Sequence, residues 1–271
     1  MQNLHCAFCG KPSLNAFEVV TKKKIFHYDI CSECKGITLC KDDFLSKEEQ
    51  KKRYLHHNND LSNTGYVSFL GSFLENVFSF LRQKGFLKDE TYFVQKHICD
   101  YGSGPRPVLV ELLHVVSCMQ RGGEGQKKAY ISQLSSEILC YGELLARTFP
   151  LLPDVHCIQG WDPFFNQSEK TEENDLVLCL EVAEHFENPR EEFIALADSC
   201  KGGGVIALGT LPLPENMTVP EGFKTWWYKD DRTHVAFYTE KAVIACGKAA
   251  GLEYLGMASS RIFMFYKPED A

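Results

Sequence analysis

The segment HICDYGSGPRPVLVELL, residues 97–113, carries two glycines and two prolines between an apolar stretch and a helical one. Its first residues predict a strand, Gly102 and Gly104 predict a tight turn, and VLVELL predicts the start of an amphipathic helix. A unit of this kind places backbone N–H groups without helical partners at a helix N-terminus, where they favour an anionic group. The feature therefore predicts an α/β fold with a mostly parallel sheet and a ligand cleft at the carboxyl ends of its strands.

Two common ligands of such a turn do not fit the sequence around it. A phosphate-binding P-loop needs G-x-x-x-x-G-K-[ST], and the chain has no such pattern. A dinucleotide site needs a third glycine where this chain has Pro107, and the acid about 20 residues further on, Glu124, lies in a glycine-rich loop. The ligand class that remains is a methyl donor, with an acid after the next strand to hold its ribose hydroxyls.

Four segments, taken in order, resemble class I S-adenosylmethionine-dependent methyltransferases. DYGSGPRPVLVELL resembles their first motif, GWDPFF their acidic motif, NDLVLCLEVAEHFENP their fourth strand and its loop, and CKGGGVIALGT the turn into their fifth strand. The resemblance covers nearly the whole chain and implies a Rossmann-like, doubly wound methyltransferase domain that uses S-adenosylmethionine. With WWYKDDRTHVAFYTE and the cysteines near the N-terminus, the chain resembles a bacterial subgroup in which a zinc ribbon precedes this domain.

The resemblance implies a donor site on the turn and at the strand ends. Residues of the turn would line the methionine end of the donor, Asp162 would accept hydrogen bonds from its ribose, and Glu181 would lie beside its reactive centre. The cofactor-binding residues implied in this way are Asp100, Tyr101, Gly102, Ser103, Gly104, Asp162 and Glu181. Two other interpretations stay open, in which the glycines form only a tight turn and Asp162 is a helix N-cap or forms an Asx-turn before Pro163.

Methyl transfer is an in-line displacement at a sulfonium methyl group. The protein mainly positions the reactants, excludes water and supplies a base where the acceptor is protonated. His234 is the best candidate base because histidine titrates near neutral pH, and Glu184 and His185 are candidates on the substrate side. The alternative for Glu184 and His185 is a role in packing or capping, and for His234 it is a hydrogen-bonded structural role at the start of a strand. The aromatic segment 226–228 either walls the acceptor pocket or fills the core.

Four of the twelve cysteines form the pattern C-x2-C, 21 residues, C-x2-C. In a reducing compartment such pairs favour a metal over disulfides, and two knuckles with this spacing close the tetrahedral shell of a structural zinc site. The predicted ligands are Cys6, Cys9, Cys31 and Cys34. Gly10 and Gly36 are expected to give the knuckles backbone freedom, and AFEVVTKKKIFHYDI predicts the two strands of a zinc ribbon. The alternative is two unrelated pairs of buried cysteines.

Helices are expected between the ribbon and the glycine turn. SKEEQKKRYLHH starts with a capping box of Ser46 and Glu49. GYVSFLGSFLENVFSFLRQKG has an apolar stripe at helical spacing, which core packing explains. The predicted units are a zinc ribbon at 1–45, a helical connecting segment at 46–92 and the methyltransferase domain at 93–271.

Two departures from the family pattern are visible. An insertion near 114–153, with a predicted helix near 131–148, separates the glycine turn from Asp162, and it covers the pocket, mediates self-association or decorates an edge. The interval between Asp162 and Asp175 leaves little room for a regular third strand, so the residues that contact adenine cannot be placed.

Composition restricts the partners. With 44% hydrophobic residues and no apolar run of the roughly 18 to 20 residues that span a bilayer, we expect a cytoplasmic globular protein without a membrane partner. A net charge of −7 disfavours nucleic acid. We expect a small-molecule methyl acceptor, while its identity and the oligomeric state stay open. The alternatives are a protein or RNA methyltransferase that uses the ribbon for recognition, and a non-catalytic donor-binding scaffold.

Overall fold

The computed structural model describes residues 5–22, 24–56, 59–121, 134–166 and 173–269. Its centre is a six-stranded sheet in the order β5-β4-β6-β7-β10-β9. The strands are β4 (Ile98–Tyr101), β5 (Ile158–Trp161), β6 (Asn174–Leu180), β7 (Cys200–Gly209), β9 (Glu253–Ser259) and β10 (Ile262–Tyr266). The first four in this order are parallel, and β10 runs antiparallel to both β7 and β9.

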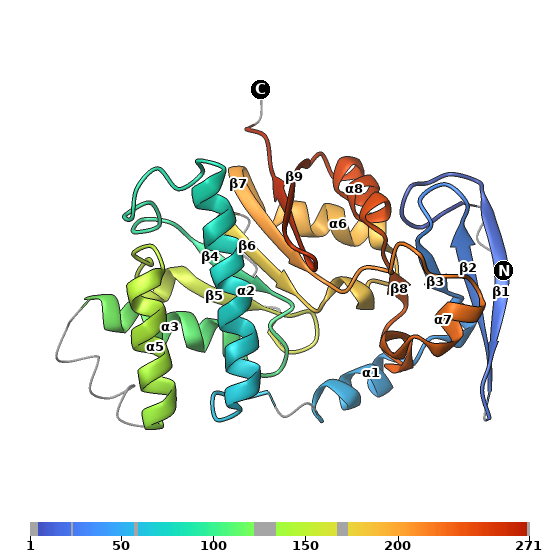
Figure 1. Ribbon diagram of the computed structural model, residues 1–271, viewed down its shortest axis with the longest axis horizontal. Coiled ribbons are helices and arrows are strands. Elements are labelled where there is room, and N and C mark those ends of the chain that lie inside the picture. Colours follow the sequence, from blue (N-terminus) through green and yellow to red (C-terminus); the bar gives the residue numbers. More distant parts are fainter. Residues whose placement is uncertain (1–4, 23, 57–58, 122–133, 167–172, 270–271) are drawn as a thin grey trace.

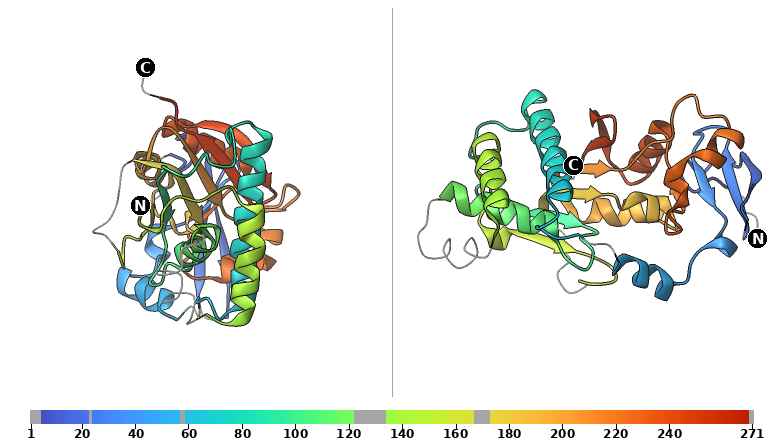
Figure 2. Two further views of the ribbon diagram at one scale, coloured as in Figure 1. Left: turned by 90° about the vertical axis from the view of Figure 1, so that its left-hand side faces the viewer. Right: turned by 60° about the horizontal axis from the view of Figure 1, so that its bottom comes forward.

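Helices cover both faces of the sheet, which confirms the predicted doubly wound α/β fold (Figures 1 and 2). One face carries α2 (Thr64–Gln83), α3 (Val108–Arg121) and α5 (Ser136–Thr148), and the other carries α6 (Pro189–Asp198) and α8 (Glu240–Ala249). Because side chains alternate along a strand, Leu176 and Leu178 of β6 pack under the first group and Val177 and Cys179 under the second. A strand buried on both faces reads as a continuous apolar run, as LVLCL does.

The order of the strands creates a crevice in the middle of the sheet. Among the strands of this sheet β4 comes first in the sequence, and it lies between β5 and β6. The chain adds β5 on one side of β4 and then crosses over to add β6 on the other side. Where the strand order of a parallel sheet reverses in this way, a ligand crevice forms at the carboxyl ends of the strands. β5 is the edge strand, and the residues described after it, 162–166, form a single bridge between Asp162 and Asn166.

The predicted stripe of the long helix is the centre of one core. Its buried residues are Val67, Leu70, Phe73, Leu74, Val77, Phe78 and Leu81. α5 begins at Ser136 within the predicted insertion, while its glycine-rich loop at 122–128 lies outside the described residues. α5 packs against α2 and α3: the Tyr141 side chain lies against Gly71, and Val115 lies against Gly142. The described part of the insertion therefore extends the helical layer.

A second, four-stranded sheet lies at the other end of the molecule, on the right in Figure 1. Its order is β1 (Leu14–Val20), β2 (Ile25–Cys31), β3 (Ile37–Leu39) and β8 (Ala236–Phe237). β8 belongs to the C-terminal part of the chain, and it pairs antiparallel with β3 through Ile37↔Phe237 and Thr38↔Ala236. The division into units at residues 45 and 92 stays a prediction, and this sheet joins segments from both ends of the sequence.

The helix α1 (Lys47–Tyr54) connects the two sheets and runs along the lower edge of the molecule (Figures 1 and 2). Its predicted capping box is present, with Glu49 N–H donating to Ser46 Oγ and Ser46 N–H donating to the Glu49 carboxylate. Short helical turns complete the fold: η1 (Lys41–Asp43), η2 (Val155–Cys157), η3 (Ala183–His185), α7 (Glu221–Thr225) and η4 (Trp227–Asp230). No described helix has both the length and the apolar character needed to cross a bilayer.

Candidate functional site

A cavity of about 1200 Å³ opens at the carboxyl ends of β4, β5 and β6. Nine of the predicted cofactor-binding and catalytic residues lie on its wall: Tyr101, Gly102, Ser103, Gly104, Asp162, Glu181, Glu184, His185 and His234. Asp100 does not contribute to the described wall and lies buried behind the turn. The structure thus brings together residues that are up to 133 positions apart, between Tyr101 and His234.

The glycine turn is built differently from the expectation. Gly102 and Gly104 have φ of +81° and +71°, a left-handed backbone that favours glycine at both positions. The N–H groups of Gly102 and Ser103 both donate to the Trp161 carbonyl, and Gly104 N–H donates to Asp162 Oδ2 at 2.9 Å. The expectation that these amides are free for an anionic ligand is therefore wrong, because β5 and Asp162 already satisfy them.

The two glycines also have different surroundings. A Cβ on Gly102 would lie 2.5 Å from a methyl group of Val182, whereas a Cβ on Gly104 would meet no atom of the described residues within 4 Å. Gly102 lets the turn pack against the loop after β6, and Gly104 leaves open space at the cavity wall.

The Asp162 side chain joins the glycine turn to the end of β5 through hydrogen bonds. Its Oδ1 accepts from the N–H groups of Phe164 and Phe165 at 2.8 and 3.1 Å, while Oδ2 accepts from Gly104. The turn-capping role that the sequence left open is thus present in the structure. A carboxylate has about four acceptor positions, and the described residues occupy three of those of Asp162.

Two carboxyl groups near the turn have raised pKa values. Burial, and to a smaller extent the charge of Asp162, raises the pKa of Asp100 from 3.8 to about 7. Burial and the charge of Glu184 also raise the pKa of Glu181, although Arg261 opposes this through a hydrogen bond of 3.0 Å. Glu181 has a φ of +53°, which is uncommon for a residue with a side chain and marks the sharp bend after β6.

The Glu184 side chain is fully buried. Tyr228 Oη donates to one carboxylate oxygen at 2.6 Å, and Thr210 Oγ1 donates to the other at 2.8 Å. Burial and the charge of Glu184 raise the pKa of Tyr228, so its hydroxyl stays a hydrogen-bond donor. These contacts fix the carboxylate in one orientation.

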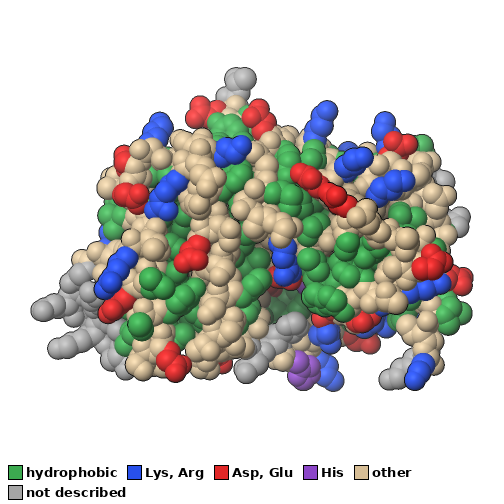
Figure 3. Space-filling view, in the orientation of Figure 1, with side chains coloured by type: hydrophobic (Ala, Val, Ile, Leu, Met, Phe, Trp, Pro, Cys, Tyr) green, Lys and Arg blue, Asp and Glu red, His purple; other side chains and the backbone are tan. Residues whose placement is uncertain are grey.

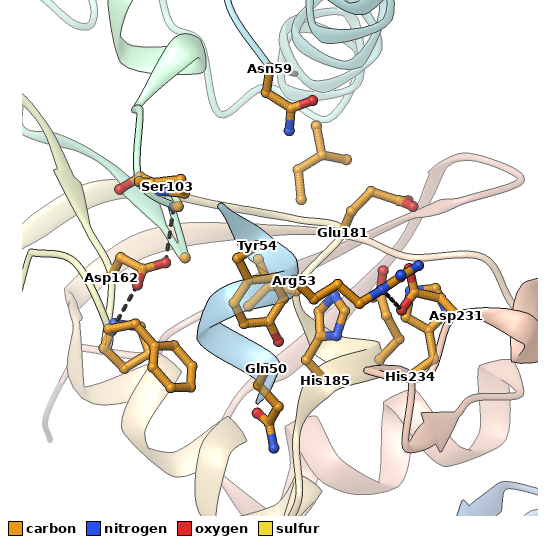
Figure 4. Close-up of a pocket in the computed structure, with 18 of the residues that line it drawn as sticks. Gln50, Arg53, Tyr54, Asn59, Ser103, Asp162, Glu181, His185, Asp231 and His234 are labelled. Atoms are coloured by element: carbon orange, nitrogen blue, oxygen red, sulfur yellow. Dashed lines mark hydrogen bonds and ion pairs between the residues drawn. The ribbon is translucent and has the colours of Figure 1, made fainter. Parts of the chain in front are cut away.

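His185 and His234 lie against each other with ring centroids 4.9 Å apart (Figure 4). His185 Nδ1 is 2.9 Å from the Thr233 carbonyl, and His234 Nδ1 is 2.7 Å from the Tyr228 carbonyl. A carbonyl oxygen only accepts, so Nδ1 carries the hydrogen in both rings and Nε2 of a neutral ring keeps its lone pair. Burial lowers the pKa of His234, which favours that neutral form.

Sequence reasoning missed the part of the wall that α1 supplies. In Figure 4 the helix carries Arg53 and Tyr54 in front of the two histidines. The Arg53 guanidinium makes two hydrogen bonds of 2.8 and 2.7 Å to Asp231, and the Tyr54 ring lies edge-on to the His185 ring at 5.4 Å. The capping box indicated this helix, but no signal in the sequence placed it across the cavity.

The aromatic segment 226–228 has both of the roles that the sequence left open, because one residue packs in a core and two line the cavity. Trp226 packs at the edge of a core with Phe223 and Phe237. Tyr228 and Trp227 line the cavity, and Trp227 is 65% exposed.

A family model for a methyltransferase domain matches residues 19–256, most of the chain. The chain belongs to this methyltransferase family. No curated protein matches it. The family match includes the end of β1 and all of β2 and β3 of the small sheet, as well as most of the six-stranded sheet.

Solved methyltransferase structures are also similar to this chain. An O-methyltransferase family 2 protein from Planctomyces limnophilus, in complex with apigenin, is 14% identical with a TM-score of 0.46, covering 84% of this chain and 63% of that one. An O-methyltransferase family protein from Burkholderia thailandensis is 12% identical with a TM-score of 0.41, covering 82% and 64%. This chain therefore spans less than two thirds of the length of either structure, and at these identities the likeness concerns the fold alone.

The four predicted zinc ligands of this family member form a compact cluster in the small sheet. Cys6 Sγ lies 3.6 Å from Cys34 Sγ, and Cys9 Sγ lies 3.6 Å from Cys31 Sγ. Sulfur atoms at the corners of a tetrahedral zinc site with bonds of about 2.3 Å are about 3.8 Å apart, so the cluster fits zinc. Backbone N–H groups of Phe8 and Glu33 point at the sulfurs of Cys6 and Cys31, as in metal-binding knuckles.

One expectation about these knuckles is wrong. Gly10 has the left-handed φ of +72°, but in the second knuckle the left-handed residue is Lys35 with a φ of +60°, and Gly36 is not left-handed. Gly36 is needed for space, because a Cβ there would lie 2.5 Å from the Phe8 ring.

Proposed function

We propose that the protein transfers a methyl group from S-adenosylmethionine to a small molecule. The observation that carries this proposal is the single cavity that holds both the predicted donor residues and the acid–histidine group. A site for one drug-sized ligand measures about 300 to 1000 Å³. The cavity of about 1200 Å³ therefore has room for the donor and a small acceptor together.

The donor would lie on the turn side of the cavity. Gly104 leaves open space where the backbone can approach the donor, and Asp162 keeps one acceptor position for a ribose hydroxyl. Glu181, at the end of β6, would lie beside the reactive end. When bound, S-adenosylmethionine supplies a methyl group on a positively charged sulfur, with the thioether as leaving group.

The acceptor would lie between the donor and the histidines. A lone pair of its nucleophilic atom forms the new bond to the methyl carbon, while the carbon–sulfur bond breaks and leaves its electron pair on sulfur. The acceptor's proton passes to Nε2 of His234, whose tautomer is set by the Tyr228 carbonyl. Tyr54 and the Arg53–Asp231 pair form the cavity wall on this side.

Two features favour a small acceptor over a protein or RNA. α1 lies across the cavity and leaves less room for a large substrate (Figure 4). On the face shown in Figure 3, acidic and basic side chains of the described residues are interspersed, a pattern that differs from the basic stripe typical of RNA-binding surfaces.

Calorimetry with S-adenosylmethionine and with its demethylated product tests the proposal. We expect micromolar or tighter binding of both to the full chain, followed by transfer of a labelled methyl group to members of a panel of hydroxylated and amine-bearing small molecules. His234→Gln should abolish transfer and keep donor binding, while His156→Gln, at an exposed and distant position, should keep both. Absence of binding by either ligand contradicts the proposal.

We also infer that Cys6, Cys9, Cys31 and Cys34 hold one structural zinc, as in the ribbon-bearing subgroup that the chain resembles. The support is the sulfur cluster described above. Four protein ligands leave no open position, so this zinc would stabilise the small sheet and take no part in the reaction. Elemental analysis of the purified chain should find zinc, and Cys31→Ser should lower its content.

A further inference from the structure

Glu184, His185 and His234 form a second cluster of potential metal ligands, separate from the cysteines. One carboxylate oxygen and one nitrogen of each ring lie within 4.8 Å of one another. All three residues line the large cavity. We propose that this cluster binds a divalent transition-metal ion that faces the acceptor side of the cavity.

The histidines are oriented as metal ligands are. A metal-bound histidine nearly always donates its other ring N–H to a carbonyl or a carboxylate, which fixes the tautomer and the ring position. Here the Thr233 carbonyl holds His185 Nδ1 at 2.9 Å, and the Tyr228 carbonyl holds His234 Nδ1 at 2.7 Å. Both Nε2 atoms are thereby left as the nitrogens with a lone pair for an ion.

The carboxylate is supported in the same manner. Tyr228 and Thr210 each donate one hydrogen bond to Glu184, and a carboxylate with about four acceptor positions keeps two for an ion. A fully buried carboxylate also needs a nearby positive charge, since isolation in a low dielectric is costly. The ion supplies that charge, and Tyr228 supports both Glu184 through its hydroxyl and His234 through its carbonyl.

The ligand set indicates the class of ion. Two imidazoles and one carboxylate suit zinc, iron, cobalt or manganese better than calcium, and three protein ligands leave positions open for water or for a substrate oxygen. The open positions face a cavity, in contrast to the closed four-cysteine cluster.

A role for this ion in the reaction rests on the proposed function. A Lewis acid lowers the pKa of a hydroxyl that binds to it. With the ion bound, this route would replace the one in which His234 is the base, because His234 would then be a ligand. The acceptor proton would pass to a water molecule in the cavity, and the oxygen would keep the electron pair that attacks the methyl carbon. The site would thus select acceptors with an oxygen that can reach the ion.

Cobalt(II) alone, added to the full chain with zinc in the ribbon, tests the site without any methyl acceptor. We expect one equivalent to bind with weak visible absorption and without the strong thiolate charge-transfer bands of cobalt in a cysteine site. Replacing both histidines, His185→Gln with His234→Gln, should abolish this binding, while His156→Gln should leave it unchanged. Tyr228→Phe keeps the ligands and removes one support of Glu184, so affinity should fall roughly 10- to 100-fold.

The outcomes separate this proposal from the proposed function. No cobalt binding outside the cysteines, or equal binding by the wild type and the double histidine variant, overturns the metal site even if the donor binds and methyl transfer occurs. Cobalt binding that depends on the histidines supports the site even if S-adenosylmethionine does not bind, in which case the methyltransferase proposal fails alone. Thermal unfolding of each variant shows whether a loss of binding follows from a loss of folding.

Discussion

Gly102 and Gly104 share a left-handed backbone, yet the structure gives them different constraints. Gly102 packs against Val182, whereas Gly104 borders open space. In the sequence Gly102 and Gly104 belong to one motif. Their neighbours show that Gly102 is needed for packing against Val182, whereas Gly104 keeps the cavity wall open.

We predict that Gly102→Ala destabilises the protein more than Gly104→Ala. Both alanines carry the left-handed strain of about 1 to 2 kcal/mol, but only the Gly102 variant adds a Cβ contact of 2.5 Å. The extra cost should be about 1 to 3 kcal/mol. Urea unfolding of the two variants measures the difference, and equal stabilities would show that Val182 can move away at no cost.

Asp100 gives a prediction about pH. Its pKa in the folded protein, about 7, lies above the unfolded value of 3.8, so the folded state binds the proton more tightly. The wild type should therefore lose stability through this group as pH rises from about 4 to 7, by at most about 4 kcal/mol. Asp100→Asn removes the effect.

Urea unfolding at pH 5 and pH 8 measures this. The stability of Asp100→Asn relative to the wild type should increase between the two pH values. Parallel changes in both proteins would mean that Asp100 is already ionised in the fold.

At the scale of elements, α1 depends on its ends and its side-chain bridges more than on a core. Gln50 is its only buried residue, and its contacts with the body include the Arg53–Asp231 pair and a 2.8 Å ion pair between Lys47 and Glu187. Exposed ion pairs contribute little each, about 0 to 1 kcal/mol. The capping box therefore adds to the bidentate Arg53–Asp231 pair in holding this helix across the cavity.

We predict that Ser46→Ala loosens α1 without unfolding the protein. Loss of an N-cap costs about 1 kcal/mol, which corresponds to roughly fivefold faster amide hydrogen exchange in this helix. Hydrogen exchange read by mass spectrometry of proteolytic peptides measures this change. The peptides that cover α2 serve as the internal control, because a wide apolar stripe anchors that helix in the core. Equal acceleration in both helices would indicate global destabilisation and not a local effect of the cap.

At the scale of the whole molecule, the small sheet and the cavity are connected through the chain near β8. Phe8, beside the cysteines, contacts Tyr238 with ring centroids 5.0 Å apart, and the Thr239 hydroxyl donates to the Cys34 carbonyl. The Val235 N–H donates to the Glu184 carbonyl at 2.8 Å, next to His234. Loosening of the cysteine cluster should therefore also loosen the chain near β8, and with it the cavity wall at His234.

We predict that Cys31→Ser speeds hydrogen exchange in β3 and β8 by roughly tenfold or more, about 1.4 kcal/mol. β4 and β6, in the centre of the large sheet, should change less because each is paired with a strand on both sides and one of their faces packs in a core that contains none of the four cysteines. Cys140→Ser is the matched control, since Cys140 is an exposed cysteine on α5. Unchanged exchange in β8 would show that the small sheet holds together without its metal ligands.

The sequence by itself was sufficient for features that local chemistry dictates. The two-sided apolar run of β6, the turn at 102–104, the capping box of α1 and the paired cysteines each depend on neighbours within a few residues or on a fixed spacing. The fold class follows from their order along the chain. The candidate donor residues were named through the resemblance of these segments to methyltransferase motifs, and they lie at or just after the ends of β4, β5 and β6.

Only the tertiary structure decided how distant segments share their contacts. The amides of the turn are used by Trp161 and Asp162, Gly36 makes room for Phe8, and β8 completes the small sheet. α1 covers the cavity although its sequence shows only that it is a helix. These contacts depend on the relative positions of whole elements, and packing between surfaces that are far apart in the chain leaves no fixed spacing in the sequence.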